Sequence, residues 1–98
     1  MLTVTNKAID FLMNLMEKLE EDQKVRIFLD ESAGNHVLGM ILDQTRDGDE
    51  VIVIQGIPFL IARELYERSK PIEIDFIEYT PGAGFKISSS LEGEKLPS

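Results

Sequence analysis

The stretch VRIFLD, residues 25–30, decides the fold, because the spacing of apolar residues changes there from a helical period to a period of two. Every second residue from Val25 to Leu29 is apolar, and Arg26 stands between the first two of them. A period of two is typical of a β-strand with one buried face. We therefore expect a helix before this stretch and mostly strands after it.

The chain before residue 25 has the pattern of a short strand followed by an amphipathic helix. Residues 2–4 (LTV) predict the strand, and Thr5 is a suitable N-cap for the helix. Apolar residues then recur at helical spacing at Ala8, Phe11, Leu12, Leu15, Met16 and Leu19. We expect a helix of about four turns with this stripe, Phe11 to Leu19, buried against a sheet.

The chain after residue 30 reads as strands separated by turns, with one more helix. The expected strands are residues 37–42, 51–54, 57–61, 72–76 and 85–88, and the helix is residues 62–70, ended by Pro71. Asp47-Gly48 predicts a tight hairpin between the first two of these strands. The segment PGAG, residues 81–84, predicts the last turn. Residues 89–98 are polar, and we expect a folded domain over residues 1–88 and a flexible tail over residues 89–98.

The composition describes one small, acidic domain. The chain has 98 residues, 18 acidic against 10 basic ones, and a formal charge of −8. This charge repels phosphate backbones and anionic lipid headgroups, so neither nucleic acid nor a membrane is an expected partner. No basic leader and no apolar stretch of membrane-spanning length is present, which favours a cytoplasmic protein.

The order of short motifs resembles the HesB/IscA family, the A-type iron-sulfur cluster carriers. The motifs are Thr3-Val4-Thr5, Val25-Arg26-Ile27, Asp49-Glu50-Val51, Gly56-Ile57, Ile74-Asp75-Phe76 and Gly84-Phe85-Lys86-Ile87. The resemblance covers residues 1 to about 88. It implies an α+β, mainly β, HesB-like domain, in which short strands form a twisted sandwich covered by the N-terminal helix and a short second helix. It also implies protein partners in iron-sulfur cluster assembly and suggests a homo-oligomer.

The chain departs from the family at the cluster ligands, because it contains no cysteine. The family places one cysteine in the loop after the second strand, which here matches Gly34, Asn35 and His36, and a Cys-Gly-Cys pair in the tail. Glu92-Gly93-Glu94 copies the spacing of that pair. Thiolates are the ligands that hold iron-sulfur clusters. We therefore expect no cofactor and no thiolate-ligated cluster.

The sequence gives only weak indications of a metal site, a phosphate-binding site or a catalytic site. His36, the only histidine, could bind iron together with Glu92 and Glu94, because imidazole and carboxylates bind non-haem iron. The acidic residues around Gly48 lack the spacing of an EF-hand calcium loop. The glycines of residues 81–84 precede a strand rather than a helix, so a phosphate loop is not expected. Serine nucleophiles have no recognisable base, whereas acid–base catalysis by paired carboxylates stays open.

Three hypotheses follow in order of preference. The first is a binding or accessory module related to iron-sulfur cluster assembly that acts through protein contacts. The second is a carrier of iron or another metal that uses His36, Glu92 and Glu94. The third is an enzyme that uses acidic residues, but we do not expect an enzyme.

Overall fold

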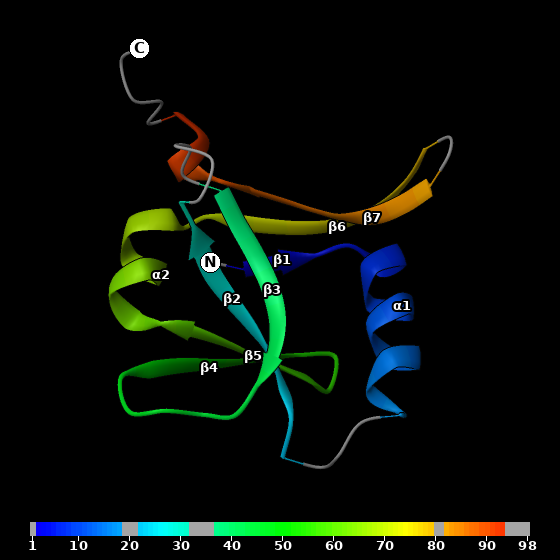
Figure 1. The fold of residues 1–98 in the computed structure, drawn as a ribbon, viewed down its shortest axis with the longest axis horizontal. Helices are drawn as coiled ribbons and strands as arrows, with labels where there is room; N and C mark the ends of the chain where they lie inside the picture. Colours follow the sequence, from blue (N-terminus) through cyan, green and yellow to red (C-terminus); the bar gives the residue numbers. More distant parts are fainter. Residues whose placement is uncertain (1, 19–21, 32–36, 80–81, 94–98) are drawn as a thin grey trace.

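The computed structural model describes residues 2–18, 22–31, 37–79 and 82–93 of the chain (Figure 1). Its elements in chain order are β1 (Leu2–Val4), α1 (Asn6–Met16), β2 (Lys24–Asp30), β3 (Val37–Asp43), β4 (Asp49–Ile54), β5 (Ile57–Ala62), α2 (Arg63–Ser69), β6 (Ile72–Tyr79), β7 (Gly82–Ser89) and the 3₁₀-helix η1 (Ser90–Gly93). The predicted order of a strand, a helix, four strands, a short helix and two strands is confirmed. The fold class is α+β and mainly β, as expected.

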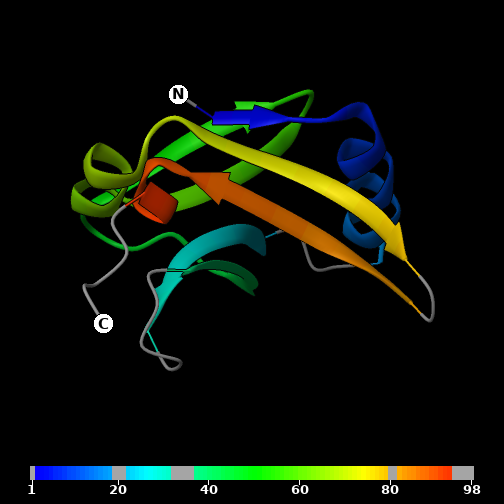
Figure 2. The same ribbon diagram turned by 90° about the horizontal axis from the view of Figure 1, so that it is seen from above.

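The strands form two sheets. One sheet has the order β1-β6-β7, in which β1 runs parallel to β6 and β7 antiparallel to it. The other has the order β3-β2-β5-β4, with β2 and β5 parallel at its centre. Figure 2 shows β6 and β7 as one long hairpin across the molecule, with β2 and β3 on one side of it. The two helices lie at opposite ends of the molecule in both views (Figures 1 and 2).

The core lies between the inner faces of the two sheets and one face of α1. Its members are Val4, Ala8, Ile9, Leu12, Val25, Ile27, Leu38, Ile57, Phe59, Ile61, Ile72, Ile74, Phe76 and Leu91. Val25 and Ile27 are buried, as the predicted alternation requires, but Arg26 between them is buried as well and Leu29 is only partly buried. Removing this apolar surface from water is the main stabilising term of the fold.

Helix α1 buries only part of the predicted apolar stripe. Thr5 caps the helix as expected, and its side chain accepts a hydrogen bond from the Ala8 amide at 3.3 Å. The buried residues are Ala8, Ile9 and Leu12, whereas Phe11 is 45% and Leu15 40% exposed. The prediction that Phe11 and Leu15 belong to the core is therefore wrong. The apolar stripe is wider than the surface that the sheets offer, so its Phe11–Leu15 side stays open to solvent.

Helix α1 is also shorter than predicted. It ends at Met16 rather than near Glu20, and the Lys18 amide donates to the Leu15 carbonyl in a closing turn. The acidic run Glu20-Glu21-Asp22 follows after Leu19. Negative charge is unfavourable at the C-terminus of a helix, where the dipole is also negative, and this disfavours further helical turns. Leu19 lies outside the described residues.

The turns differ from the prediction at two places. Gly48 has the expected positive φ of 87°, but the strands that flank this turn, β3 and β4, lie at opposite edges of their sheet and form no hairpin. The predicted turn of residues 81–84 is shorter, because β7 begins at Gly82, which pairs with Tyr79. Gln55 and Gly56, with φ values of 49° and 83°, make the two-residue connection from β4 to β5.

The chain continues in regular structure after residue 88. Strand β7 ends at Ser89, and η1 follows and places Leu91 in the core with 1% of its surface exposed. The expectation that Leu91 lies in a flexible tail is wrong, because one large apolar side chain is enough to anchor a short segment. The division of the chain into a domain of residues 1–88 and a tail of residues 89–98 stays a prediction.

Candidate functional site

The positions that match the family's cluster ligands are mostly outside the described residues. Gly34, Asn35, His36 and Glu94 lie in segments that the structure does not describe. Glu92 is in η1, and its side chain is also outside the description. Within the described part of the chain, no group of three His, Cys, Asp or Glu residues could hold a metal ion. The metal site of His36, Glu92 and Glu94 therefore stays a prediction.

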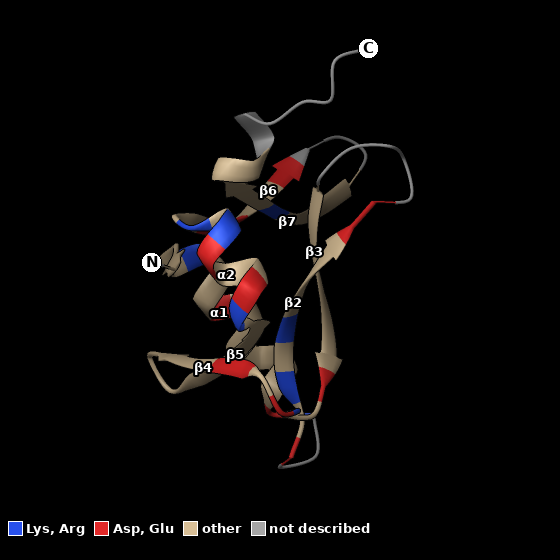
Figure 3. Cartoon of the chain, turned by 90° about the vertical axis from the view of Figure 1, so that its left-hand side faces the viewer, with Lys and Arg blue, Asp and Glu red and all other residues tan. Residues whose placement is uncertain are grey.

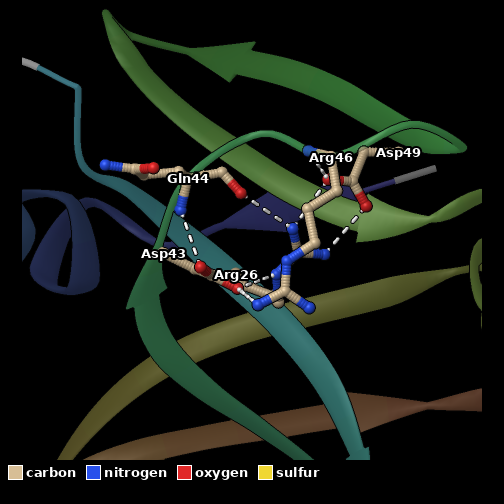
Figure 4. A network of polar contacts seen from close by, with 5 residues as sticks. All are labelled: Arg26, Asp43, Gln44, Arg46 and Asp49. Atoms are coloured by element: carbon tan, nitrogen blue, oxygen red, sulfur yellow. Dashed lines mark hydrogen bonds and ion pairs between the residues drawn. The ribbon is translucent and has the colours of Figure 1, made fainter.

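Charged residues of both signs lie close together on the ribbon where β2 begins, β3 ends and β4 begins (Figure 3), and we call Arg26, Asp43 and Asp49 the ionic cluster. The Arg26 guanidinium is at its centre and is buried (Figure 4). Its Nη1 and Nη2 donate to the two carboxylate oxygens of Asp49 at 2.8 and 2.7 Å. Its Nε donates to Oδ2 of Asp43 at 2.6 Å, and Nη2 also donates to the Gln44 carbonyl at 3.1 Å. This is the fork geometry in which arginine binds carboxylates most strongly.

The ionic cluster holds its carboxylates in the charged form. The hydrogen bonds from Arg26 lower the pKa of Asp49 to about 2. The Gln44 amide and then Arg26 lower the pKa of Asp43. The Arg26 pKa is raised, first by its bonds to Asp49. Acid–base catalysis near neutral pH needs groups that titrate there, so these residues stabilise the fold rather than exchange protons.

The other carboxylate of β4 is paired as well. Glu50 accepts a hydrogen bond from Nε of Arg63 at 2.8 Å, and the Arg46 amide donates to Asp49 at 2.7 Å. Calcium requires several oxygen ligands directed at one point. These contacts hold the turn before β4 to the sheet instead, in agreement with the absence of a calcium-loop spacing.

Three aromatic rings join α1 to the β6–β7 hairpin. The Phe11 and Phe76 rings are stacked with centroids 3.7 Å apart and an interplanar angle of 16°. Phe85 meets Phe76 edge-on, with centroids 5.1 Å apart. Aromatic pairs in these geometries stabilise a fold by more than the burial of their apolar surface alone would. They hold Phe11 and Phe85 in place although both rings are partly exposed.

An apolar groove lies beside these rings, between α1, β3 and β7. It has a volume of about 110 Å³. Its lining is Leu12, Leu15, Val25, Met40, Ile41, Leu42 and Phe85. Leu15, Ile41, Leu42 and Phe85 are exposed as well as lining the groove. A contiguous exposed apolar surface on a small domain is typical of an interaction site, and we call this set of seven residues the apolar groove.

The apolar groove has little chemistry to offer beyond apolar contact. All seven lining residues are hydrophobic, so they provide no carboxylate, imidazole or thiolate and no acid or base. The flexible thioether of Met40 can adapt to an incoming group. A second hollow is lined by both apolar and polar residues, Thr3, Pro71, Ile72, Glu73 and Ser88 to Ser90, and contains a single carboxylate. It does not provide the pair of carboxylates that the enzyme hypothesis requires.

Sequence reasoning missed both features. The period of two places Arg26 on the face opposite Val25 and Ile27, and nothing local to it indicates that Asp49, 23 residues further along, would meet it. The sequence does contain an indication of the apolar groove, because the stripe on α1 has more apolar residues than the three that the helix buries. Helical spacing alone predicts that all of these residues belong to the core.

Comparison with solved structures confirms the fold. The chain matches the crystal structure of IscA with a [2Fe-2S] cluster at a TM-score of 0.68 and 24% identity, over 92% of this chain and 83% of IscA. It matches Escherichia coli SufA, described as involved in the biosynthesis of iron-sulfur clusters, at a TM-score of 0.69 and 20% identity, over 90% and 84% of the two chains. A solution structure of a protein from Aquifex aeolicus matches at 0.64 and 25% identity, over 88% of each chain.

The resemblance to the HesB/IscA family is thus confirmed at the level of the fold. No family model and no curated protein matches the chain. The structure also contains no helix, among the residues it describes, with the length and apolar composition to cross a membrane.

Proposed function

We propose that this chain is an accessory module of iron-sulfur cluster assembly that binds other proteins and holds no thiolate-ligated cluster of its own. The observation that carries the proposal is a carrier fold without cysteine. The chain has the fold of IscA and SufA along about nine-tenths of its length, yet its sequence has no cysteine. The proposed place of action is the cytoplasm.

The apolar groove supports a role in protein binding. It is open to solvent, and the stacked rings of Phe11 and Phe76 keep its α1 side in position. Its volume of about 110 Å³ suits one large apolar side chain of a partner rather than a cofactor. Anchors of this kind contribute most of the affinity in many protein interfaces. We therefore propose the apolar groove as the partner-binding surface.

Cluster reconstitution tests the absence of a cluster. The untagged protein is incubated without oxygen with ferrous iron, sulfide and a thiol reductant, then desalted, with IscA treated in parallel as the positive control. We expect IscA to retain a sulfide-to-iron absorption band and this chain to retain none, since it offers no thiolate. A band that survives desalting in this chain would contradict the proposal.

A second candidate is the metal carrier, favoured by the position of His36 in the loop that matches a family ligand and by the spacing of Glu92 and Glu94. Calorimetric titration with ferrous iron decides it with three proteins: the parent chain, His36→Ala and a chain that ends at Gly93. Stoichiometric binding by the parent that is lost in both variants would establish the carrier. We expect no specific binding in any of the three proteins.

A further inference from the structure

The second hollow lies at one end of the β1-β6-β7 sheet and has a volume of about 470 Å³. It is found where β6 begins and β7 ends, which is the end of the sheet next to α2 and η1 (Figure 1). Its lining combines the ring of Pro71 and the carboxylate of Glu73 with the hydroxyls of Thr3 and Ser88 to Ser90. An apolar wall, several hydroxyls and one negative charge together define what this hollow can bind.

The register of the strands places three of these side chains in one row. Glu73 on β6 lies opposite Thr3 on β1 and opposite Ser88 on β7. Neighbouring strands are about 5 Å apart, and the side chains of directly opposite residues point to the same face. Ile72 and Ile74, on either side of Glu73, are buried, so the row lies on the outer face of the sheet. The carboxylate of Glu73 is thus flanked by one hydroxyl side chain on each side.

The hydroxyl groups of the hollow fall into two sets. Those of Ser89 and Ser90 are engaged within the chain, because the first accepts a hydrogen bond from the Leu91 amide at 3.2 Å and the second donates to the Arg68 carbonyl at 3.1 Å. These bonds hold the rim of the hollow where β7 continues into η1. The two hydroxyls of the row form no hydrogen bond with any described residue, so they are available to accept one from a ligand.

The exposed Glu73 carboxylate has no ion pair with any residue in the described part of the chain. Lys70, three residues before it, is paired with Glu67 at 2.7 Å. Lys86 on the neighbouring strand lies opposite Asp75 instead. We therefore look for the positive charge that completes this row in another molecule.

A lysine side chain of another protein fits this arrangement. Its ammonium group has three N–H donors and no acceptor, and the row offers one carboxylate and two hydroxyls as acceptors. Its apolar stem finds a surface at Pro71, since lysine tends to lay its stem on apolar surface while its charge stays at a polar one. The formal charge of −8 on the chain also attracts basic partners.

Two other cations fit less well. A calcium or magnesium ion takes six or more oxygen ligands, usually with more than one carboxylate, and the row has a single carboxylate. A guanidinium group prefers two parallel hydrogen bonds to one carboxylate, which would leave the two hydroxyls of the row unused. An ammonium group uses all three members of the row.

We propose that the second hollow binds a lysine side chain of a partner protein, with the ammonium group held by Glu73 between the hydroxyls of Thr3 and Ser88. The site shares no residue with the apolar groove. The proposal therefore goes beyond the proposed function and does not depend on it.

Nuclear magnetic resonance titration of the ¹⁵N-labelled chain tests the proposal with three short peptides. They have the common sequence Gly-Gly-X-Gly-Gly with both ends blocked, where X is lysine, acetyllysine or arginine. Acetyllysine keeps the apolar stem and removes the charge. We expect the lysine peptide to bind in the millimolar range and to shift the amide signals of Thr3, Glu73 and Ser88, and the other two peptides to bind more weakly.

Three variants identify the groups that bind. Glu73→Gln removes the charge and keeps the shape of the side chain, and Ser88→Ala removes one hydroxyl of the row. Glu17→Gln is the matched control, because Glu17 is an exposed glutamate directly after α1, the helix at the opposite end of the molecule from α2 (Figure 1). Circular dichroism checks that each variant is folded, and Ser88→Ala keeps the test valid if Glu73→Gln does not fold.

We expect Glu73→Gln to weaken binding of the lysine peptide about tenfold or more and Ser88→Ala to weaken it about threefold, since a hydrogen bond to a charged group is the stronger kind. Glu17→Gln should bind like the parent. A parent chain that does not bind the lysine peptide, an acetyllysine or arginine peptide that binds as tightly, or an equal loss in Glu17→Gln would each overturn the proposal.

Discussion

The ionic cluster around Arg26 and the apolar groove between α1, β3 and β7 are opposites. The first is made of charged side chains that are withdrawn from water, and the second is made of apolar side chains that stay in contact with it. Each arrangement is unfavourable on its own, because burial penalises charge and exposure penalises apolar surface. In the ionic cluster, the chain itself offsets the cost of burying charge, because the buried charges of opposite sign pair with one another.

This difference separates the region that stabilises the fold from the region that we propose binds a partner. The guanidinium of Arg26 bonds to Asp43, Asp49 and the Gln44 carbonyl, so nothing in it requires a second molecule. The apolar groove has no such compensation within the described residues, and we propose that a partner provides it. The ionic cluster should therefore control stability and the apolar groove should control binding.

The largest expected effect is that of Arg26→Ala. Removing Arg26 takes away the guanidinium that pairs with the buried carboxylate of Asp49, and we expect a loss of about 3–5 kcal/mol in the free energy of unfolding. Urea denaturation measures it. Arg46→Ala is the control, because the Arg46 side chain is exposed and its ion pair with Asp43 contributes about 1 kcal/mol or less. Equal losses of unfolding free energy in the two variants would contradict the claim that the buried Arg26 contributes more to stability than the exposed Arg46.

Two leucines of α1 differ in burial: Leu12 lies in the core, and Leu15 lines the apolar groove on its exposed side. Leu12 is buried, and Leu12→Ala should lower the free energy of unfolding by about 2–5 kcal/mol. Leu15 is exposed, and we expect a loss of about 1 kcal/mol or less for Leu15→Ala, in keeping with surface substitutions. Thermal or urea unfolding of both variants measures the difference. A loss at Leu15 as large as at Leu12 would place the stripe in the core and remove the basis of the apolar groove.

Acid should weaken the ionic cluster. The pKa of Asp49 falls from an ordinary 3.8 to about 2 in the folded chain. A lowered pKa in the folded state adds stability above pH 3.8, and this stability is lost as the pH falls towards 2, because the unfolded chain takes up the proton first. The contribution is about 2 kcal/mol. Unfolding free energies measured from pH 6 to pH 2 should show this loss in the parent and a smaller one in Asp49→Asn.

Most of the fold could be predicted from the sequence because its periodicity is local. The change of period at Val25 and the cap at Thr5 depend on residues within a few positions of each other, and the element order follows from them. The placing of β3 and β4 at opposite edges could not be predicted, since it depends on which strands pair across the sheet. Leu91 was missed because its core partners are distant in sequence and its neighbours are polar.

The candidate site could be predicted only in outline. The absence of cysteine excludes thiolate ligands directly from the sequence. The apolar groove, in contrast, is assembled from α1, β2, β3 and β7, and the exposed part of the α1 stripe cannot be told from its buried part without the sheets that cover Ala8, Ile9 and Leu12. Helical spacing reports that a face is apolar and does not report how much of it is covered.

Partner binding by the apolar groove is the central claim, and nuclear magnetic resonance tests it most directly. The ¹⁵N-labelled chain is titrated in turn with IscA, a cluster scaffold and a cysteine desulfurase, and the titration is repeated with Leu15→Asp. We expect at least one of these proteins to shift the amide signals of Leu15, Met40 and Phe85, and Leu15→Asp to remain folded but lose the interaction. The account is contradicted if none of the three proteins binds, or if the shifted signals lie elsewhere and Leu15→Asp binds like the parent.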